Sequence, residues 1–313
     1  MPLIHVAAGI IRDRQGRVLL TKRPDHAHQG GLWEFPGGKI QHHETAAQGL
    51  ARELKEELGI TVNAAEPLIE IHHSYPDLNV CLQVFNIMDF SGDPAGLENQ
   101  PLKWLAPDQI DQLVMPAADR PIINAVRLPP SYAISGSFEN RDDFLRHLQN
   151  LLDQGLELIQ LRAKGLDLPE LKDLAMAGHQ LCREHNAKLL LNGPVGLVRE
   201  LGLAGVHLNA SALMSYQERP LSSRYWVAAS CHNKQELVQA QTLGADFVCL
   251  SPVLPTTSHP GAKSLGLTGF QELCRVTNLP VYALGGMKPA DLMQVRHAGG
   301  QGIAGISTFW SVG

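Results

Sequence analysis

The chain has 313 residues, of which 44% are hydrophobic and 18% are charged. These values are typical of a folded globular protein and exclude a disordered chain, a collagen-like repeat and a coiled coil. Because 31 Asp and Glu residues outnumber 26 Lys and Arg residues, the net charge of −5 gives no general attraction for nucleic-acid polymers. Small phosphorylated ligands remain compatible with this charge, since a metal ion can neutralise a phosphate.

Two simple features bear on the compartment. No apolar run approaches the roughly 18–20 residues that cross a bilayer, so we expect no membrane partner. The cysteines are odd in number, widely spaced and free of any C-x-x-C pair, which indicates neither a disulfide framework nor a zinc site. They are Cys81, Cys182, Cys231, Cys249 and Cys274. We therefore expect a reducing, cytoplasmic compartment.

The length predicts two domains, since one domain usually takes about 100–200 residues. Pro129 and Pro130 follow a helical stretch and favour an extended link there. We place the domains at residues 1–128 and 129–313. The first contains runs with strand character at residues 4–11, 18–21, 69–75, 80–90 and 102–105, and helical patterns at 44–58 and 119–128. Such a mixture predicts an α+β domain.

The second half has a regular rhythm of short apolar runs separated by helical patterns. The runs lie at residues 132–135, 158–162, 188–192, 205–208, 226–230, 247–251, 281–284 and 302–306. Buried parallel strands read as unbroken apolar runs, so the alternation predicts a compact (β/α)₈ TIM barrel. Only residues 307–313 follow the last run, so we expect the usual final helix to be missing.

The most informative segment is the predicted helix at residues 44–58, which Gly59 would end. Glu53, Glu56 and Glu57 are spaced i, i+3 and i+4, so their carboxylates share one side of it. Three like charges there repel one another unless a hard divalent cation such as Mg²⁺ neutralises them. The alternative is a solvated acidic surface balanced by Arg52 and Lys55.

The full spacing favours the metal site. Its fixed positions are Gly38, Glu44, Arg52, Glu53, Glu56, Glu57 and Gly59, with aliphatic residues at Leu54 and Ile60. This pattern resembles the Nudix box, G-x₅-E-x₇-R-E-U-x-E-E-x-G-U, at every position. Residues 1–128 also resemble the MutT-type 8-oxo-dGTP diphosphatases at residues 7–11, 21–23, 27–28, 31–39 and 97–104. The resemblance implies a Nudix α/β/α sandwich with a mixed sheet.

The resemblance implies a role for each matching residue. The metal ligands for Mg²⁺, or Mn²⁺, would be Gly37, Glu53, Glu56, Glu57 and Glu98, and Glu98 is alternatively the general base. Lys39 would contact phosphate, and Arg52 and Glu44 would orient the catalytic helix. The substrate contacts would come from Arg23, His28, Glu34, Phe35 and Asp119. Water would attack a phosphorus of a nucleoside triphosphate and release a nucleoside monophosphate and pyrophosphate.

The base contact is the weakest part of this match. In the family an Asn in the penultimate helix reads the oxidised purine, and Asp119 stands in that place here. An amide both donates and accepts hydrogen bonds, whereas an ionised carboxylate only accepts. Leu78 also replaces a family Arg near a Pro-Asp turn. A thiamine-related pyrophosphate or another nucleoside diphosphate derivative is therefore an alternative substrate, and His28 and Phe35 are alternatively a loop residue and a core residue.

The second half resembles the thiamine phosphate synthase/TenI family over residues 131–313. The resemblance implies a thiamine-type phosphate as ligand, held by Gln160, Arg162, Lys164, Gly285, Gly286 and Ser307. The two glycines are alternatively turn and packing positions. The segments Asn192-Gly193 and Asn209–Ala212 stand where the family carries its two magnesium-binding aspartates, and neither contains a carboxylate. We therefore expect weak or no synthase activity, with an active synthase, a binding module and a scaffold as the alternatives.

Overall fold

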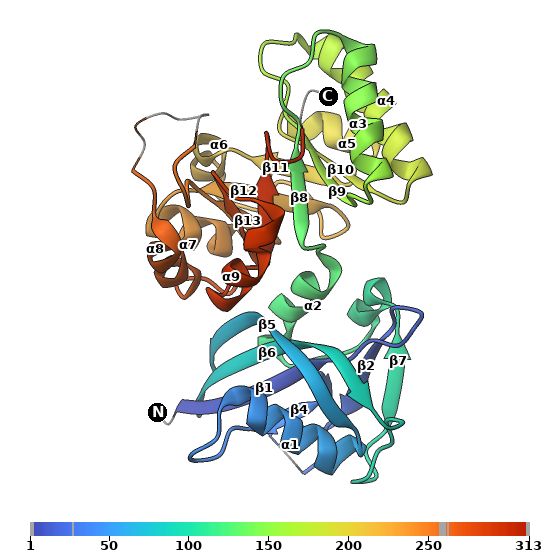
Figure 1. Ribbon diagram of the computed structural model, residues 1–313, viewed down its shortest axis with the longest axis vertical. Coiled ribbons are helices and arrows are strands. Elements are labelled where there is room, and N and C mark those ends of the chain that lie inside the picture. The colour runs from blue at the N-terminus through green and yellow to red at the C-terminus, as the bar shows by residue number, and fades with distance from the viewer. Residues whose placement is uncertain (1–2, 27, 257–260, 262, 311–313) are drawn as a thin grey trace. The chain divides into compact units, whose positions relative to one another are not determined.

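The computed structural model describes residues 3–26, 28–256, 261 and 263–310 (Figure 1). It divides into two compact units, Met1–Arg127 and Leu128–Gly313. Within the described residues, no helix is both long and apolar enough to cross a membrane.

The first unit contains two sheets between two helices. A four-stranded mixed sheet has the order β4-β1-β6-β5, in which β1 and β6 are parallel, and a three-stranded antiparallel sheet has the order β3-β2-β7. The strands are β1 (Leu3–Ile10), β2 (Val18–Lys22), β3 (Trp33–Glu34), β4 (Gly37–Lys39), β5 (Thr61–Ser74), β6 (Asn79–Ser91) and β7 (Leu102–Leu105). The helices are α1 (Ala46–Leu58) and α2 (Arg120–Arg127).

Alternation along the central strands separates two apolar layers. Odd-numbered residues of β1, including Ala7, pack with Leu50 and Leu54 of α1. Even-numbered residues, including Ala8, pack with Ile122 of α2. This arrangement confirms the α/β/α sandwich with a mixed sheet.

The observed bounds differ from the expected ones for local reasons. Helix α1 begins at Ala46, because Thr45 is the N-cap and forms a capping box with Gln48. Strand β5 begins at Thr61 rather than near residue 69, because register shifts before Ile69 interrupt its apolar alternation. Strands β3 and β4 were not predicted, because they are too short to show a period of two.

The second unit is a closed barrel of eight parallel strands, in the order β10-β11-β12-β13-β14-β15-β8-β9, which confirms the predicted architecture. Its strands are β8 (Ser131–Ile134), β9 (Leu158–Leu161), β10 (Lys188–Leu191), β11 (Gly205–Leu208), β12 (Trp226–Cys231), β13 (Phe247–Leu250), β14 (Val281–Leu284) and β15 (Gly302–Gly305). Its helices are α3 (Arg141–Asp153), α4 (Leu168–Glu184), α5 (Val195–Leu201), α6 (Ala210–Ser215), α7 (Lys234–Leu243), α8 (Gly266–Cys274) and α9 (Leu292–His297).

The barrel is filled rather than hollow. Tyr132, Phe247 and Tyr282 are fully buried inside it and meet as neighbouring aromatic rings. After β15 the described residues, which reach Trp310, form only turns, so no final helix follows within them. The sides of the barrel strands that face outward carry the larger apolar layer, which the surrounding helices cover.

Candidate active site

The first part of the site is a close approach between β4 and α1. A Cβ atom at Gly38 would lie 2.2 Å from Cδ of Glu53 and 2.4 Å from its Oε2. Only a glycine therefore leaves room for the Glu53 carboxylate beside this strand. Gly37 is equally constrained, because its φ is 147° and a Cβ there would lie only 2.1 Å from the Ala7 carbonyl oxygen. The two glycines thus bring bare backbone against the acidic side of the helix.

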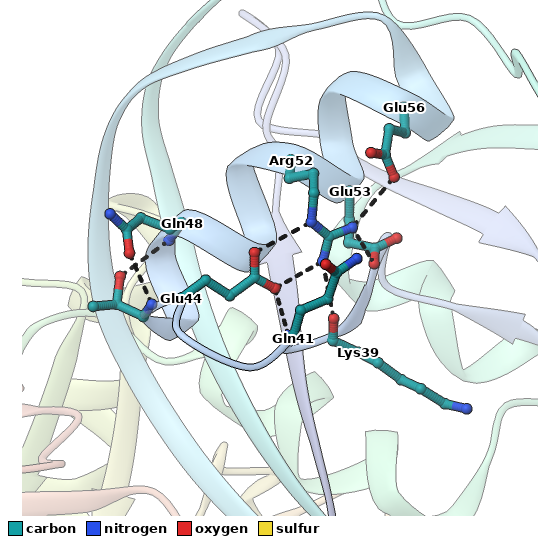
Figure 2. A network of polar contacts seen from close by, with 8 residues as sticks. Lys39, Gln41, Glu44, Gln48, Arg52, Glu53 and Glu56 are labelled. Carbon is teal, nitrogen blue, oxygen red and sulfur yellow. Dashed lines mark hydrogen bonds and ion pairs between the residues drawn. The ribbon is translucent and has the colours of Figure 1, made fainter.

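Arg52 holds this arrangement together (Figure 2). Its guanidinium donates to Glu44 Oε1 at 2.8 Å, to Glu53 Oε1 at 2.8 Å and to the Lys39 carbonyl oxygen at 3.1 Å. It also reaches the exposed Glu56, with Nη1 3.2 Å from Oε2. These bonds raise the pKa of Arg52 and hold the pKa of Glu44 below its ordinary value. The Lys39 side chain itself extends away from the arginine.

The carboxyl of Glu57 is partly buried and lies near other acidic groups. Burial raises the pKa of its carboxyl to about 8, and the nearby Glu34, Glu53 and Glu98 contribute to the same shift. A hydrogen bond with the backbone of Gly37 acts in the opposite direction. Three further carboxyl groups therefore lie within electrostatic range of Glu57, an arrangement that is costly without a cation.

The main chain positions Glu98 in this group. The amide of Leu97 donates to the Glu57 carbonyl oxygen at 2.9 Å, and Nε2 of Gln100 donates to the same oxygen at 3.0 Å. The Gln100 side-chain oxygen in turn accepts from the Glu98 amide at 2.9 Å. The loop that carries Glu98 is thus fastened to the last turn of α1, which satisfies carbonyl oxygens that a helix end leaves unpaired.

Glu34 links this acidic group to a second cluster. It forms an ion pair with Arg23, and burial raises its pKa despite that partner. The Nε atom of Arg23 also donates to the His28 carbonyl oxygen at 2.9 Å. The His28 ring lies 5.1 Å from the Tyr75 ring in an edge-on arrangement and 3.4 Å, Nε2 to Oδ1, from Asp77. The loop after β2 and the turn between β5 and β6 therefore meet.

Asp119 is the buried member of this second cluster. The Tyr75 hydroxyl accepts from the Ala118 amide at 3.5 Å, which brings the 3₁₀ turn at Ala117–Asp119 to the tyrosine. Asp119 is 6% exposed, and its Oδ2 atom has no hydrogen-bond partner among the described residues. Burial raises the pKa of Asp119 well above its usual range, and Glu34 adds to the shift while Arg23 opposes it. The raised pKa favours the protonated form of this carboxyl, which can donate a hydrogen bond.

Two placements differ from the sequence interpretation. Phe35 is 3% exposed and belongs to the apolar layer beside α2, which is its alternative role as a core residue. Tyr75 was not predicted to belong to the site, although it connects His28 with Ala118. The only sequence signal was its place just before the Pro-Asp turn, and a single aromatic residue at the end of a strand is usually structural.

The barrel interior contains a buried polar network near the carboxyl ends of the strands. The Tyr132 hydroxyl lies 3.1 Å from both Gln160 Nε2 and His207 Nδ1. His207 Nε2 lies 2.8 Å from the Ser230 hydroxyl, and burial with the nearby Arg162 lowers the pKa of this histidine to about 3. Gln160 is thus a buried member of this network, while its role as a ligand contact stays a prediction.

The remaining predicted barrel residues line the strand ends. Arg162 is half-buried, and Lys164 and Ser307 are exposed. Gly285 and Gly286 have φ values of 97° and 68°, and a Cβ at Gly286 would lie 2.6 Å from the Pro255 carbonyl oxygen. Close packing and the left-handed backbone therefore explain both glycines without a ligand.

Asn192 and Asn209, which lie in the two segments where the family carries its aspartates, have structural partners. Asn192 Nδ2 donates to Gln160 Oε1 at 3.3 Å. Asn209 is the N-cap of α6, where its side-chain oxygen accepts from the Ala212 amide at 2.9 Å. Neither residue offers the ionised carboxylate that a magnesium-bound pyrophosphate needs.

Comparison with known proteins accounts for both units. Residues 131–309 match the family model described as thiamine monophosphate synthase, and residues 7–125 match the NUDIX domain model. An 8-oxo-dGTP diphosphatase of Escherichia coli (strain K12) is 34% identical over 123 residues, which are 39% of this chain and 95% of that protein. The chain belongs to the thiamine monophosphate synthase family and carries a NUDIX domain before it.

Further relatives extend both likenesses. The NUDIX domain is 38% identical over 125 residues to a CTP pyrophosphohydrolase of Escherichia coli (strain K12), over 40% of this chain and 92% of that protein. The barrel is 32% identical over 184 residues to a thiamine-phosphate synthase of Thioalkalivibrio sulfidiphilus (strain HL-EbGR7), over 58% of this chain and 87% of that protein. Both resemblances drawn from the sequence are thereby confirmed, at the level of family.

Proposed function

We propose that residues 1–128 form a Mg²⁺-dependent diphosphatase that hydrolyses 8-oxo-dGTP to 8-oxo-dGMP and pyrophosphate, and that residues 129–313 form a separate ligand-binding domain. The observation that carries the hydrolase is the surroundings of Glu57, where burial and three further acids raise the pKa of its carboxyl to about 8. A protein gains nothing in stability from such a group of acids, so we infer that it serves to bind a cation.

The donor set fits a hard divalent cation. Carboxylate oxygens and a backbone carbonyl are the ligands that Mg²⁺ and Mn²⁺ prefer. Glu53, Glu56 and Glu57, with the Gly37 carbonyl oxygen, would hold the ion, and Glu98 would be either a further ligand or the general base. When bound, the ion would neutralise the polyphosphate and lower the pKa of a coordinated water.

Side chains of this domain would orient the metal ligands, accept a proton and contact phosphate. Arg52, fixed by Glu44, holds Glu53 in place and so orients the acidic side of α1. In this scheme Glu98 accepts a proton from the attacking water. The exposed Lys39 contacts the phosphate groups of the leaving pyrophosphate. Attack on a phosphorus within the chain of phosphates releases the nucleoside monophosphate and pyrophosphate, and fixed positions of the reactants lower the barrier.

The raised pKa of Asp119 favours its protonated form and so supports a purine that presents both an acceptor and a donor. A protonated carboxyl donates through its O–H and accepts through its carbonyl oxygen, which is the pattern of the amide that the MutT-type family uses. The Oδ2 atom of Asp119 has no hydrogen-bond partner among the described residues, and a bound ligand would supply one. Arg23, His28 and Glu34 would contact the sugar and the base, and Tyr75 would lie beside them.

A cytidine nucleotide is the second candidate, favoured by the 38% identity with the CTP pyrophosphohydrolase. A neutral Asp119 can donate to N3 of cytosine and accept from its exocyclic amine, so its protonation alone does not choose between the bases. A thiamine-related pyrophosphate is a further candidate, because the barrel belongs to a thiamine-pathway family.

For the barrel we propose that a thiamine-type phosphate binds at the strand ends, near Arg162, Lys164 and Ser307, with synthase turnover weak or absent. The segments at residues 192–193 and 209–212 support this, since neither contains the carboxylate of a metal-binding aspartate, and Asn192 and Asn209 have structural partners. We also propose a cytoplasmic location, which the free thiols of all five cysteines support.

The test is a substrate panel on the full chain with Mg²⁺: 8-oxo-dGTP, dGTP, CTP and thiamine diphosphate. We expect the highest kcat/KM for 8-oxo-dGTP. Glu53→Gln and Glu57→Gln should each lower turnover by about 100-fold or more, because each removes a metal ligand. The matched control Asp93→Asn, an exposed acid of the same unit, should not change it. Unchanged turnover in both glutamine variants would refute the mechanism, and a tenfold preference for CTP or thiamine diphosphate would refute the substrate.

A further inference from the structure

Three side chains of different chemistry meet on one face of the four-stranded sheet, and none of them belongs to the carboxylate group around Glu57. Glu70 and His72 lie on β5, and Cys81 lies on the neighbouring β6 (Figure 1). Each offers one ligand atom, and these three atoms all lie within 4.8 Å of one another. The distance between Glu70 Oε1 and His72 Nε2 is 2.9 Å.

The register of the sheet produces this meeting. His72 is paired with Cys81 across β5 and β6, and Glu70 lies two residues earlier on the same face. All the register shifts of β5 occur before Ile69, so the pairing from there to Ser74 is regular. On the other side of β6, the parallel strand β1 pairs His5 with Cys81, which places a second imidazole on the same face.

These groups match the ligand preference of a particular class of metal. A thiol, an imidazole and a carboxylate are ligands for Zn²⁺ and similar transition metals, whereas Mg²⁺ favours oxygen ligands alone. We propose that Glu70, His72 and Cys81 form a second metal site, selective for Zn²⁺ or a similar transition metal and separate from the proposed Mg²⁺ site.

The burial of the three residues suits entry of an ion from solvent. The side chains of His72 and Glu70 are 48% and 37% exposed, while Cys81 is buried at the base of the site. Burial and the neighbouring Glu70 raise the pKa of the Cys81 thiol to about 11. A metal ion that binds there displaces the thiol proton to water and forms a metal–sulfur bond in its place.

Co²⁺ is the probe for this site, because a cobalt–thiolate bond gives a charge-transfer absorption that a site of oxygen ligands does not. The experiment titrates Co²⁺ into the reduced, untagged full chain with excess Mg²⁺ present. Cys81 is the single cysteine of residues 1–127, and the barrel cysteines are all buried. The variants are Cys81→Ser and His72→Gln, with His73→Gln as the matched control on the opposite face of β5.

We expect the wild-type chain, His73→Gln and Glu57→Gln to develop the absorption with one equivalent of Co²⁺, and Zn²⁺ to abolish it by displacement. Cys81→Ser should lose it, and His72→Gln should weaken Co²⁺ binding by about tenfold or more. Circular dichroism checks that each variant is folded. The proposal is wrong if the wild-type chain shows no absorption, if Cys81→Ser retains it, or if Glu57→Gln removes it.

Discussion

Replacement of Glu57 by Gln should stabilise the metal-free protein while it abolishes hydrolysis. The pKa of the Glu57 carboxyl is about 8 in the folded chain, against an ordinary value of 4.5. The folded state therefore retains its proton between these two values while the unfolded state has lost it. Stability of the first unit consequently falls as the pH rises from 4.5 towards 8, and the full cost applies above 8.

The magnitude follows from that difference. Full ionisation of such a carboxyl costs the folded state on the order of 5 kcal/mol at one pKa unit per 1.36 kcal/mol. Because the Glu57 side chain is only partly buried, solvent screening reduces this to about 2 kcal/mol. A glutamine has the same size and no charge, so Glu57→Gln should raise the free energy of unfolding by about 2 kcal/mol near pH 8.5 and by much less near pH 5.

Hydrogen exchange of the α1 amides, measured by mass spectrometry on the full chain in a metal chelator, reports this free energy for the first unit alone. Asp93→Asn is the control, because it removes an exposed carboxylate from the same unit. Addition of Mg²⁺ should protect α1 in the wild-type chain and much less in the variant. Equal protection of wild type and Glu57→Gln near pH 8.5, without metal, would show that ionised Glu57 does not destabilise the folded first unit.

Three further predictions concern separate parts of the molecule. Gly38→Ala should lower turnover by about 100-fold with the fold intact, because the added methyl group displaces the Glu53 carboxylate. Near-normal turnover with an unchanged circular dichroism spectrum would count against that close contact. Asp119→Asn should keep its kcat/KM at high pH. The wild type should lose activity there, because Asp119 loses its O–H donor when the pH passes its raised pKa. Parallel pH profiles of kcat/KM for the two proteins would contradict a protonated Asp119. Thiamine phosphate should raise the midpoint of thermal unfolding of the barrel without product formation, and the absence of a shift would leave only a scaffold.

The architecture was largely predictable because its signals are local. The barrel strands read as separate apolar runs, and the spacing of Glu53, Glu56 and Glu57 predicted an acidic side of a helix. The predicted helix at residues 44–58, ended by Gly59, agrees with α1 to within two residues, although its N-cap at Thr45 was not predicted. Each of these features depends on residues close together in the sequence.

The remaining features depend on contacts between distant segments. Tyr75 joins His28 to the turn that carries Asp119, and no spacing in the sequence brings these three together. The ionisation of Asp119 depends on burial, which a sequence does not report. The proposed ligands Glu70, His72 and Cys81 are a second example, because they lie on two neighbouring strands and form no C-x-x-C or other local pattern in the sequence.

We propose that the acids around Glu57 bind a divalent cation for pyrophosphohydrolysis of an oxidised purine nucleotide. The most direct measurement is chromatographic analysis of the products from 8-oxo-dGTP, with the full chain, with and without Mg²⁺. We expect stoichiometric 8-oxo-dGMP and pyrophosphate, formed only with the metal and with a higher kcat/KM than for CTP. Release of inorganic phosphate instead of pyrophosphate, or hydrolysis that does not depend on a divalent metal, would contradict it.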